Sequence, residues 1–257
     1  MVDLRFEALS ASYGRIPVLH AASAHIAGGA VTGLIGPNGS GKSTLLRAIA
    51  GLIPARGEVS VDGEAMTGDA ARTRIAYMPQ DVSASSSLTL LEVVLLGRLK
   101  SLGLTVPAAI LDEAHAALDR FGLGPMAGRT LDSVSGGQRQ LAYLAQALFR
   151  RPRVLLLDEP TAALDLRHQL VVLETVRAMA GADGIAVMIA IHDLSLAAQF
   201  ADRFICLHEG GIDCIGGAQE VLTPEKLRRI YRVDAEVVQG PDGKPRITPL
   251  RAALAAP

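Results

Sequence analysis

An early glycine-rich segment has the residue pattern of a loop that binds phosphate. Gly36 to Ser43 matches G-x-x-x-x-G-K-[ST] at every fixed position and follows an apolar segment. Glycines let successive backbone N–H groups turn toward one anion, Lys42 is placed to reach the outer phosphates of a nucleotide, and Ser43 offers a hydroxyl to Mg²⁺. The predicted phosphate-binding residues are Gly36, Pro37, Asn38, Gly39, Ser40, Gly41, Lys42, Ser43 and Thr44.

Two adjacent carboxylates follow a second apolar segment. Val154 to Leu157 has the character of a buried strand, and Asp158 and Glu159 come directly after it. Open α/β sheets bind ligands at the carboxyl ends of their strands. We expect Asp158 to be the partner of Mg²⁺ and Glu159 to be the base that orients the attacking water in phosphoryl transfer.

A third motif, VSGGQRQ, spans Val134 to Gln140. Ser135 with Gln138 three residues later is a capping box, which predicts a helix that begins here. The N-terminus of such a helix presents free N–H groups and the positive end of the helix dipole, so it suits an anion.

Together the three motifs resemble the ABC ATPase family, whose signature is a Ser-Gly-Gly-Gln run shortly before the acidic strand. The signature here reads Ser135, Gly136, Gly137 and Gln138, and Val134 stands where Leu is commoner in the family. The resemblance implies an enzyme that hydrolyses ATP with Mg²⁺. It also implies that the signature of one chain faces the γ-phosphate held by a second copy, so that a monomer has half a site.

Four more positions take their roles from this resemblance. Tyr13 matches the aromatic residue that stacks on adenine, although a half-buried strand tyrosine is the alternative. Gln80, in YMPQD, matches the glutamine near Mg²⁺ and the water, and His192 matches the histidine that contacts the γ-phosphate. Asp165 resembles the residue that contacts the partner's site, and it is also placed to cap the next helix. The other histidines are interpreted as surface or packing residues: His20, His25, His115, His168 and His208.

Hydrophobic patterns predict the elements that position these residues. Alternation of apolar and polar residues predicts an N-terminal antiparallel layer of short strands. These strands are marked by Leu4, Phe6, Leu9, Ile26 and Val31, with breaks at Gly14, Pro17 and Gly28–Gly29. Buried or short strands are also predicted at Val31 to Ile35, Glu58 to Gly63, Arg74 to Pro79, Val154 to Leu157 and Ile185 to Ile191. A helix between the last two makes a βαβ unit of a parallel sheet.

Helical periodicity dominates the middle of the chain, at Leu90 to Leu99, Ile110 to Phe121 and Gln138 to Phe149. These patterns predict an α/β chain with an N-terminal antiparallel β layer and an inserted helical sub-domain. The family resemblance implies that this is the P-loop ABC ATPase fold, with a RecA-like parallel-sheet core. One domain spans residues 1–257, with the core and its C-terminal extension in 1–80 and 151–257 and the helical sub-domain in 81–150.

The C-terminal part is predicted to hold a helix at Leu194 to Asp202, a hairpin around Gly210, a short helix at Pro224 to Tyr231 and a hairpin that turns at Pro241 to Gly243. Cys206 and Cys214 flank the first of these turns and are expected to be reduced thiols with a packing role, rather than a disulfide or a metal site.

Composition excludes several classes of protein. The 25 Lys and Arg residues balance 26 Asp and Glu residues, so no global basic field attracts nucleic acid. The longest fully apolar run, Ile185 to Ile191, is far shorter than the roughly 20 residues that cross a bilayer. The N-terminus lacks the pattern of a signal peptide, so no export is expected.

Two further segments resemble the type II importers of iron-siderophore complexes, heme and cobalamin: Thr89 to Arg98 and Leu222 to Val238. The resemblance implies a motor subunit that lies peripherally on the cytoplasmic face of the bacterial inner membrane. Its implied partners are a second copy, polytopic permease subunits that dock on the region after Gln80, and, indirectly, a periplasmic or surface substrate-binding protein. A zinc or manganese importer, and a soluble ABC ATPase that acts on DNA or ribosomes, remain alternatives.

Overall fold

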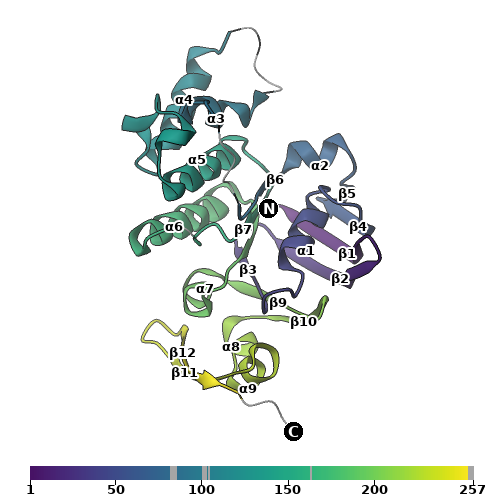
Figure 1. Cartoon of the computed structure of the whole chain (residues 1–257). Helices are drawn as coiled ribbons and strands as arrows, with labels where there is room; N and C mark the ends of the chain where they lie inside the picture. The colour runs from purple at the N-terminus through teal and green to yellow at the C-terminus, as the bar shows by residue number, and fades with distance from the viewer. Residues whose placement is uncertain (82–85, 100–102, 104, 163, 254–257) are drawn as a thin grey trace.

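A six-stranded, mainly parallel sheet forms the centre of the chain in a computed structural model, which describes residues 1–81, 86–99, 103, 105–162 and 164–253 (Figure 1). Its strand order is β10-β9-β3-β8-β7-β6, and only β10 runs antiparallel to its neighbour. The strands are β3 (Val31–Ile35), β6 (Ile75–Met78), β7 (Val154–Asp158), β8 (Ala186–Ala190), β9 (Arg203–His208) and β10 (Gly211–Gly216). Every residue of β3, β7 and β8 is buried, as expected for parallel strands that are covered on both faces.

The N-terminal residues form a second, antiparallel sheet of order β2-β1-β4-β5. Its strands are β1 (Asp3–Tyr13), β2 (Ile16–Ala27), β4 (Arg56–Val61) and β5 (Glu64–Ala65). The predicted short strands were wrong, because β1 and β2 are long and continue through register shifts. Ala8 and Ala21 adopt positive φ values of 48°, and this conformation lets each strand bulge without ending. Pro17 lies within β2, at the edge of the sheet, where a strand tolerates a residue without an N–H.

Gly57 of β4 allows a close approach between the backbones of β4 and β1. Its φ is 104°, and a Cβ atom there would lie 2.5 Å from the carbonyl oxygen of Glu7 and 2.7 Å from that of Ala8. We expect Gly57→Ala to lower the free energy of unfolding by about 2 kcal/mol or more. Gly63→Ala is the control, because its φ is 79° but nothing lies within 4 Å of the added Cβ. If denaturant unfolding showed equal losses of unfolding free energy for the two variants, the role of the close contact would be contradicted.

Two hydrophobic cores lie on opposite faces of the central sheet. One joins the antiparallel sheet to helix α1 (Lys42–Ile49), which follows β3 directly. The other covers the opposite face with α5 (Gly136–Phe149), α6 (Leu166–Asp183) and α7 (Leu194–Phe200) (Figure 1). Because β7 and β8 are adjacent and parallel, with α6 between them in sequence, the predicted βαβ unit is confirmed. The short helix α2 (Asp69–Arg74) was not predicted.

Helices occupy most of the described part of residues 86–150. They are α3 (Leu90–Leu96), α4 (Ala108–Asp119) and α5, with single 3₁₀ turns at η2 (Gly124–Met126) and η3 (Leu131–Ser133). Figure 1 shows α3, α4 and α5 gathered to one side of the sheet. The prediction of helices here is confirmed, although α3 ends at Leu96, three residues before the predicted end. The boundaries 81 and 150 stay a prediction, and residues 82–85, 100–102 and 104 lie outside the described residues.

The C-terminal elements pack beside β9 and β10. They are α8 (Ala218–Val221), α9 (Pro224–Lys226), a turn of π-helix η4 (Leu227–Tyr231), β11 (Val233–Gln239) and β12 (Pro245–Ala252). Both predicted hairpins form, and Cys206 and Cys214 are partners across the first, as free thiols. Burial raises the pKa of the Cys206 thiol to about 12, so it is an inert packing residue at neutral pH. None of the described helices is both long and apolar enough to span a bilayer.

Candidate active site

The glycine-rich loop connects β3 to α1 at the carboxyl end of the central sheet. Gly36, Gly39 and Gly41 adopt positive φ values of 149°, 78° and 101°. A Cβ atom on Gly36 would lie 2.3 Å from the carbonyl oxygen of Leu207 and 2.6 Å from Ser40 Oγ, so only glycine fits. The Ser40 hydroxyl is buried, and no described residue forms a hydrogen bond with it. The loop thus forms a cradle with a polar group free to receive an anion.

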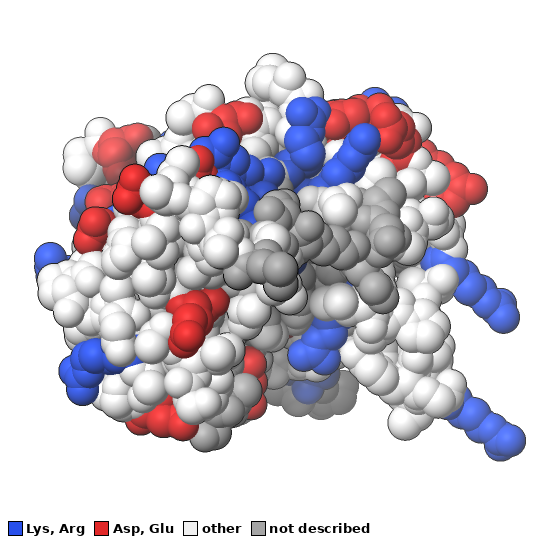
Figure 2. Space-filling view, turned by 90° about the horizontal axis from the view of Figure 1, so that it is seen from above, with Lys and Arg blue, Asp and Glu red and all other residues white. Residues whose placement is uncertain are grey.

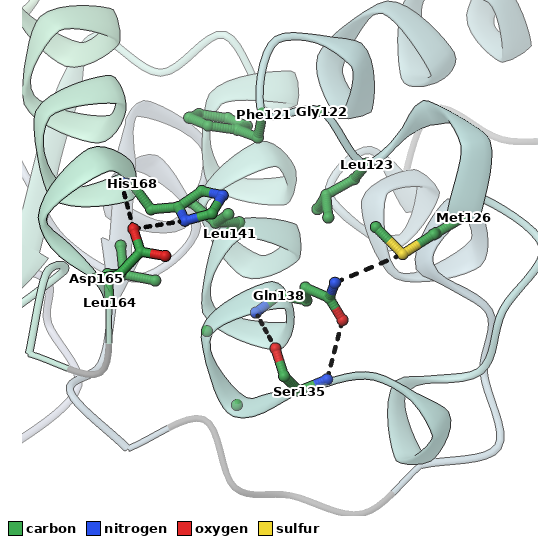
Figure 3. A pocket seen from close by; sticks show the side chains of 12 residues that line it. Phe121, Gly122, Leu123, Met126, Ser135, Gln138, Leu141, Leu164, Asp165 and His168 are labelled. Carbon is green, nitrogen blue, oxygen red and sulfur yellow. Dashed lines mark hydrogen bonds and ion pairs between the residues drawn. The ribbon is translucent and has the colours of Figure 1, made fainter.

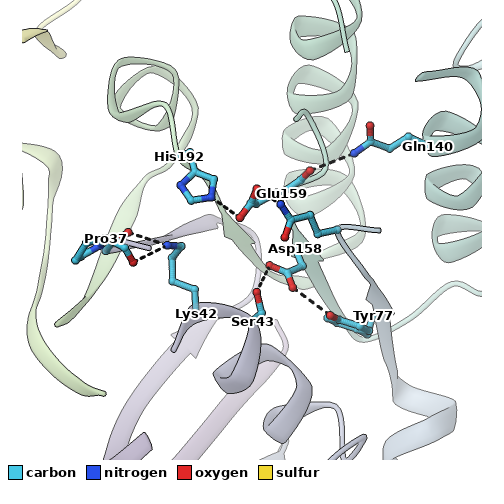
Figure 4. A network of polar contacts seen from close by, with 10 residues as sticks. Pro37, Lys42, Ser43, Tyr77, Gln140, Asp158, Glu159 and His192 are labelled. Atoms are coloured by element: carbon cyan, nitrogen blue, oxygen red, sulfur yellow. Dashed lines mark hydrogen bonds and ion pairs between the residues drawn. The ribbon is translucent and has the colours of Figure 1, made fainter. Parts of the chain in front are cut away.

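Lys42 lies within this cradle and is 6% exposed. Its amino group donates hydrogen bonds to the carbonyl oxygens of Gly36, at 2.7 Å, and Pro37, at 3.1 Å (Figure 4). Burial lowers the pKa of Lys42, and the negative charges of Glu159 and Asp158 oppose that shift. A buried ammonium group bonded only to carbonyl oxygens is ready to accept a phosphate as a stronger partner.

Asp158, at the end of β7, is fully buried and held through both of its carboxylate oxygens. Ser43 Oγ donates to Oδ1 at 3.0 Å, and Tyr77 Oη donates to Oδ2 at 3.1 Å (Figure 4). Arg47 Nε in turn donates to Tyr77 Oη at 3.2 Å. The predicted pair of Ser43 and Asp158 therefore meets in space. Arg47 was missed because no motif includes it, and Tyr77 was missed because only Gln80 of YMPQD was assigned a role.

Glu159 lies beside Asp158 and points toward two of the other predicted residues. Gln80 Nε2 donates to Glu159 Oε2 at 2.6 Å, and His192 Nε2 contacts Oε1 (Figure 4). The backbone carbonyl of Glu159 accepts a hydrogen bond from Gln140 at 3.1 Å. Glu159 has a φ of 52°, which is uncommon for a residue with a side chain. A carboxylate held in this way between an amide and an imidazole has the arrangement of a general base with its orienting groups.

The motif from Ser135 to Gln138 begins helix α5, as predicted. Ser135 Oγ accepts a hydrogen bond from Gln138 N at 3.2 Å, and Gln138 Oε1 accepts one from Ser135 N at 3.0 Å. This helix N-terminus lines a hollow of about 490 Å³ that also holds Asp165 and His168 (Figure 3). None of the described residues that line the hollow belongs to the glycine-rich loop. Within one chain the Ser135 motif therefore lies outside the glycine-rich loop's surroundings, in a hollow that the loop does not line.

Asp165 is the N-cap of helix α6, so the prediction that it caps this helix is confirmed. Its Oδ1 atom accepts hydrogen bonds from the backbone N–H of His168 at 2.9 Å and from His168 Nδ1 at 2.8 Å. The bond from the backbone N–H contributes most to lowering the pKa of Asp165, so the carboxylate is charged at neutral pH. His168, predicted to be a surface or packing residue, lies instead in the hollow of the Ser135 motif (Figure 3).

Tyr13 is the last residue of β1. It is 47% exposed, and its phenol lies near the Arg47 guanidinium. An exposed ring at this place is free to stack on a flat ligand.

Known proteins match both the sequence and the structure of this chain. A family described as ABC transporter matches residues 19–162. The hemin import ATP-binding protein of Rhodopseudomonas palustris is 38% identical, over 96% of this chain and 94% of the relative. This chain belongs to the ABC transporter family.

Two other relatives have related names. The ferric enterobactin transport ATP-binding protein of Escherichia coli is 35% identical, over 96% of this chain and 94% of the relative. The cobalamin import ATP-binding protein of Halobacterium salinarum is 43% identical over 91% of this chain, which spans only 60% of that relative's length. The predicted resemblance to the type II importer ATPases is thereby confirmed.

Solved structures confirm the predicted fold class. One is an inward-facing conformation of a transporter provisionally assigned to the metal-chelate type, with a TM-score of 0.82, 27% identity and 98% of each chain covered. Another is a dimer of an ATP-binding cassette in a post-hydrolysis state with ADP and Pi, with a TM-score of 0.76 and 28% identity, which covers 83% of this chain and 98% of that one. ABC ATP-binding subunits hydrolyse ATP to power transport, so this chain is an ATPase of that kind.

Proposed function

We propose that this chain is the ATP-hydrolysing motor of a bacterial importer for a metal chelate of the iron-siderophore, heme or cobalamin type. The observation that carries the catalytic part is the convergence of Ser43, Asp158, Glu159, Gln80 and His192 at the end of the glycine-rich loop. The cargo class follows from the names of the relatives, which are import proteins for hemin, ferric enterobactin and cobalamin.

The residues at this place fit a magnesium ion. Ser43 and Asp158 supply a hydroxyl and a carboxylate whose oxygens lie 3.0 Å apart, and oxygen is the ligand that Mg²⁺ prefers. The described residues contain no cluster of three or more His, Cys, Asp or Glu side chains that could hold a metal alone. This fits an ion that is shared between one or two protein groups and the phosphates of a nucleotide. Once bound, Mg²⁺ neutralises charge on those phosphates.

Each side chain then has a distinct part in hydrolysis. Lys42 exchanges its carbonyl partners for the outer phosphate oxygens, and the backbone of the loop binds the same group. Glu159 orients the attacking water and accepts its proton, while Gln80 and His192 hold the carboxylate from two sides. His192 also contacts the γ-phosphate. Tyr13 stacks on the adenine ring.

The glycine-rich loop and the hollow of the Ser135 motif become one site when two copies pair head to tail. The capped N-terminus of α5, with Ser135, Gly136, Gly137 and Gln138, then faces the γ-phosphate held by the other copy. Asp165 lies in the same hollow as this motif, so it also faces the partner. The dimeric cassette with a TM-score of 0.76 supports such an arrangement. ATP thus joins the two copies, and its hydrolysis releases them.

The region of α3 is the proposed docking surface for the permease, and the chain lies on the cytoplasmic face of the membrane. Leu96, the last residue of α3, is 41% exposed, and Leu99, three residues after it, is 60% exposed. In the view from above, the face over α3 and α4 has a broad uncharged area beside a group of basic side chains, with acidic side chains to either side (Figure 2). An uncharged surface that carries exposed leucines is suited to a protein partner.

A co-purification experiment tests this docking surface and the function together. Expressed with a polytopic permease, the chain is expected to co-purify in detergent, and Leu96→Glu with Leu99→Glu is expected to abolish the complex while ATP binding persists. Val238→Glu is the matched control, since Val238 is 50% exposed on β11. Stable association with ribosomes or DNA instead of a permease would contradict import, and a zinc or manganese permease as the specific partner would contradict the chelate cargo.

A further inference from the structure

The hydrogen bonds around Asp158 form a closed ring that includes two residues to which the sequence analysis assigned no role. Ser43 and Arg47 both belong to α1, four residues apart, so they lie on the same side of that helix. Ser43 bonds directly to Asp158, whereas Arg47 reaches the same carboxylate through Tyr77 of β6. Helix α1 therefore holds Asp158 at both of its oxygens.

The direction of the hydrogen bonds in this ring is fixed by chemistry. Arginine has only donors, so the Tyr77 oxygen must accept from Arg47 Nε. The hydrogen of the phenol is then directed away from Arg47, and Asp158 Oδ2 is the acceptor that it meets at 3.1 Å.

Tyr77 also lies three residues before Gln80, which contacts the neighbouring carboxylate of Glu159. One short segment at the end of β6 thus touches both members of the acidic pair, Asp158 through the phenol and Glu159 through the amide. A shift of this segment would move both carboxylates together.

We propose that Tyr77 is a positioning residue for the magnesium site, which orients the Asp158 carboxylate toward the metal and is itself directed by Arg47. This inference rests on the proposed function, because it assumes that Asp158 faces Mg²⁺ bound with the nucleotide. Outer partners of this kind fix the orientation of a metal-binding carboxylate, and their loss commonly weakens metal affinity by about 10- to 100-fold.

The test is the affinity for Mn²⁺, used as a spectroscopic substitute for Mg²⁺, in the full chain saturated with a non-hydrolysable ATP analogue. Electron paramagnetic resonance is expected to show about 10-fold weaker Mn²⁺ binding for Tyr77→Phe. Nucleotide affinity measured in EDTA is expected to stay within about 2-fold of the unsubstituted chain, because the phenol contacts no phosphate-binding group. Tyr143→Phe, which removes a phenol from α5 outside this ring, is the matched control.

A second variant tests the part of Arg47. Arg47→Met is expected to weaken Mn²⁺ binding less than Tyr77→Phe does, and the double variant is expected to bind Mn²⁺ no more weakly than Tyr77→Phe alone, since Arg47 acts through the phenol. Unchanged Mn²⁺ affinity in Tyr77→Phe, or an equal loss of nucleotide affinity in EDTA, would overturn the inference. If the unsubstituted chain failed to bind Mn²⁺ with the analogue, the proposed function would fail instead.

Discussion

Glu159→Gln is expected to lower the rate of ATP hydrolysis by about 10²- to 10⁴-fold while ATP still binds. The amide has the shape of the carboxylate, so the contacts with Gln80 and His192 can re-form in a similar geometry. It cannot accept a proton from water at neutral pH, however, so the general base is lost. Because hydrolysis releases the dimer, this variant is also expected to accumulate as an ATP-bound dimer.

Two measurements check this prediction. Phosphate release gives the rate of ATP hydrolysis, and light scattering with and without ATP gives the molecular mass, which distinguishes monomer from dimer. Glu174→Gln removes an exposed carboxylate from α6 and is expected to leave the hydrolysis rate and the molecular mass unchanged. A normal rate of ATP hydrolysis by Glu159→Gln would show that Glu159 is not the general base. If the variant stayed monomeric with ATP, that result would count against the two-copy site.

The sequence was sufficient to predict the parts of the site that lie in continuous motifs. The glycine-rich loop, the acidic pair at the end of β7 and the capped start of α5 all form as expected, because each depends on residues that are close in sequence. The family resemblance supplied Gln80 and His192, which come together at Glu159 only through the parallel order of β6, β7 and β8.

Contacts between distant segments were not predictable in the same way. Arg47 carried no signal beyond its place in a helix, and in YMPQD only Gln80 had a role to assign. The contacts of Tyr77 with Arg47 and Asp158, which bring β6, α1 and β7 together, appear only in the fold. The bulges in β1 and β2 likewise escaped prediction. Alanines at positive φ resemble any other strand residue, so the breaks were assigned to glycine and proline instead.

Gly136→Asp is expected to abolish the ATP-dependent dimer while leaving the monomer intact. Gly136 is the first residue of α5, and nothing lies within 4 Å of a Cβ atom added to it. An acidic residue in the first turn of a helix is favourable for the helix dipole, so the midpoint of thermal unfolding should stay the same or rise slightly. In the paired state, however, the new carboxylate would face the γ-phosphate of the other copy. Like charges placed together across an interface cost several kcal/mol, so hydrolysis is expected to fall by about 100-fold or more.

The comparison with Gly136→Asn separates charge from size. Asn adds nearly the same volume without the charge, and it is expected to retain far more hydrolysis than Asp. ATP binding to the isolated monomer should be equal in both variants, because no residue of the glycine-rich loop lines the hollow of the Ser135 motif in one chain. A loss of ATP binding by the Gly136→Asp monomer would show that the motif serves its own chain's nucleotide. Normal hydrolysis by Gly136→Asp would show that no phosphate approaches the start of α5, and the two-copy site would then be wrong.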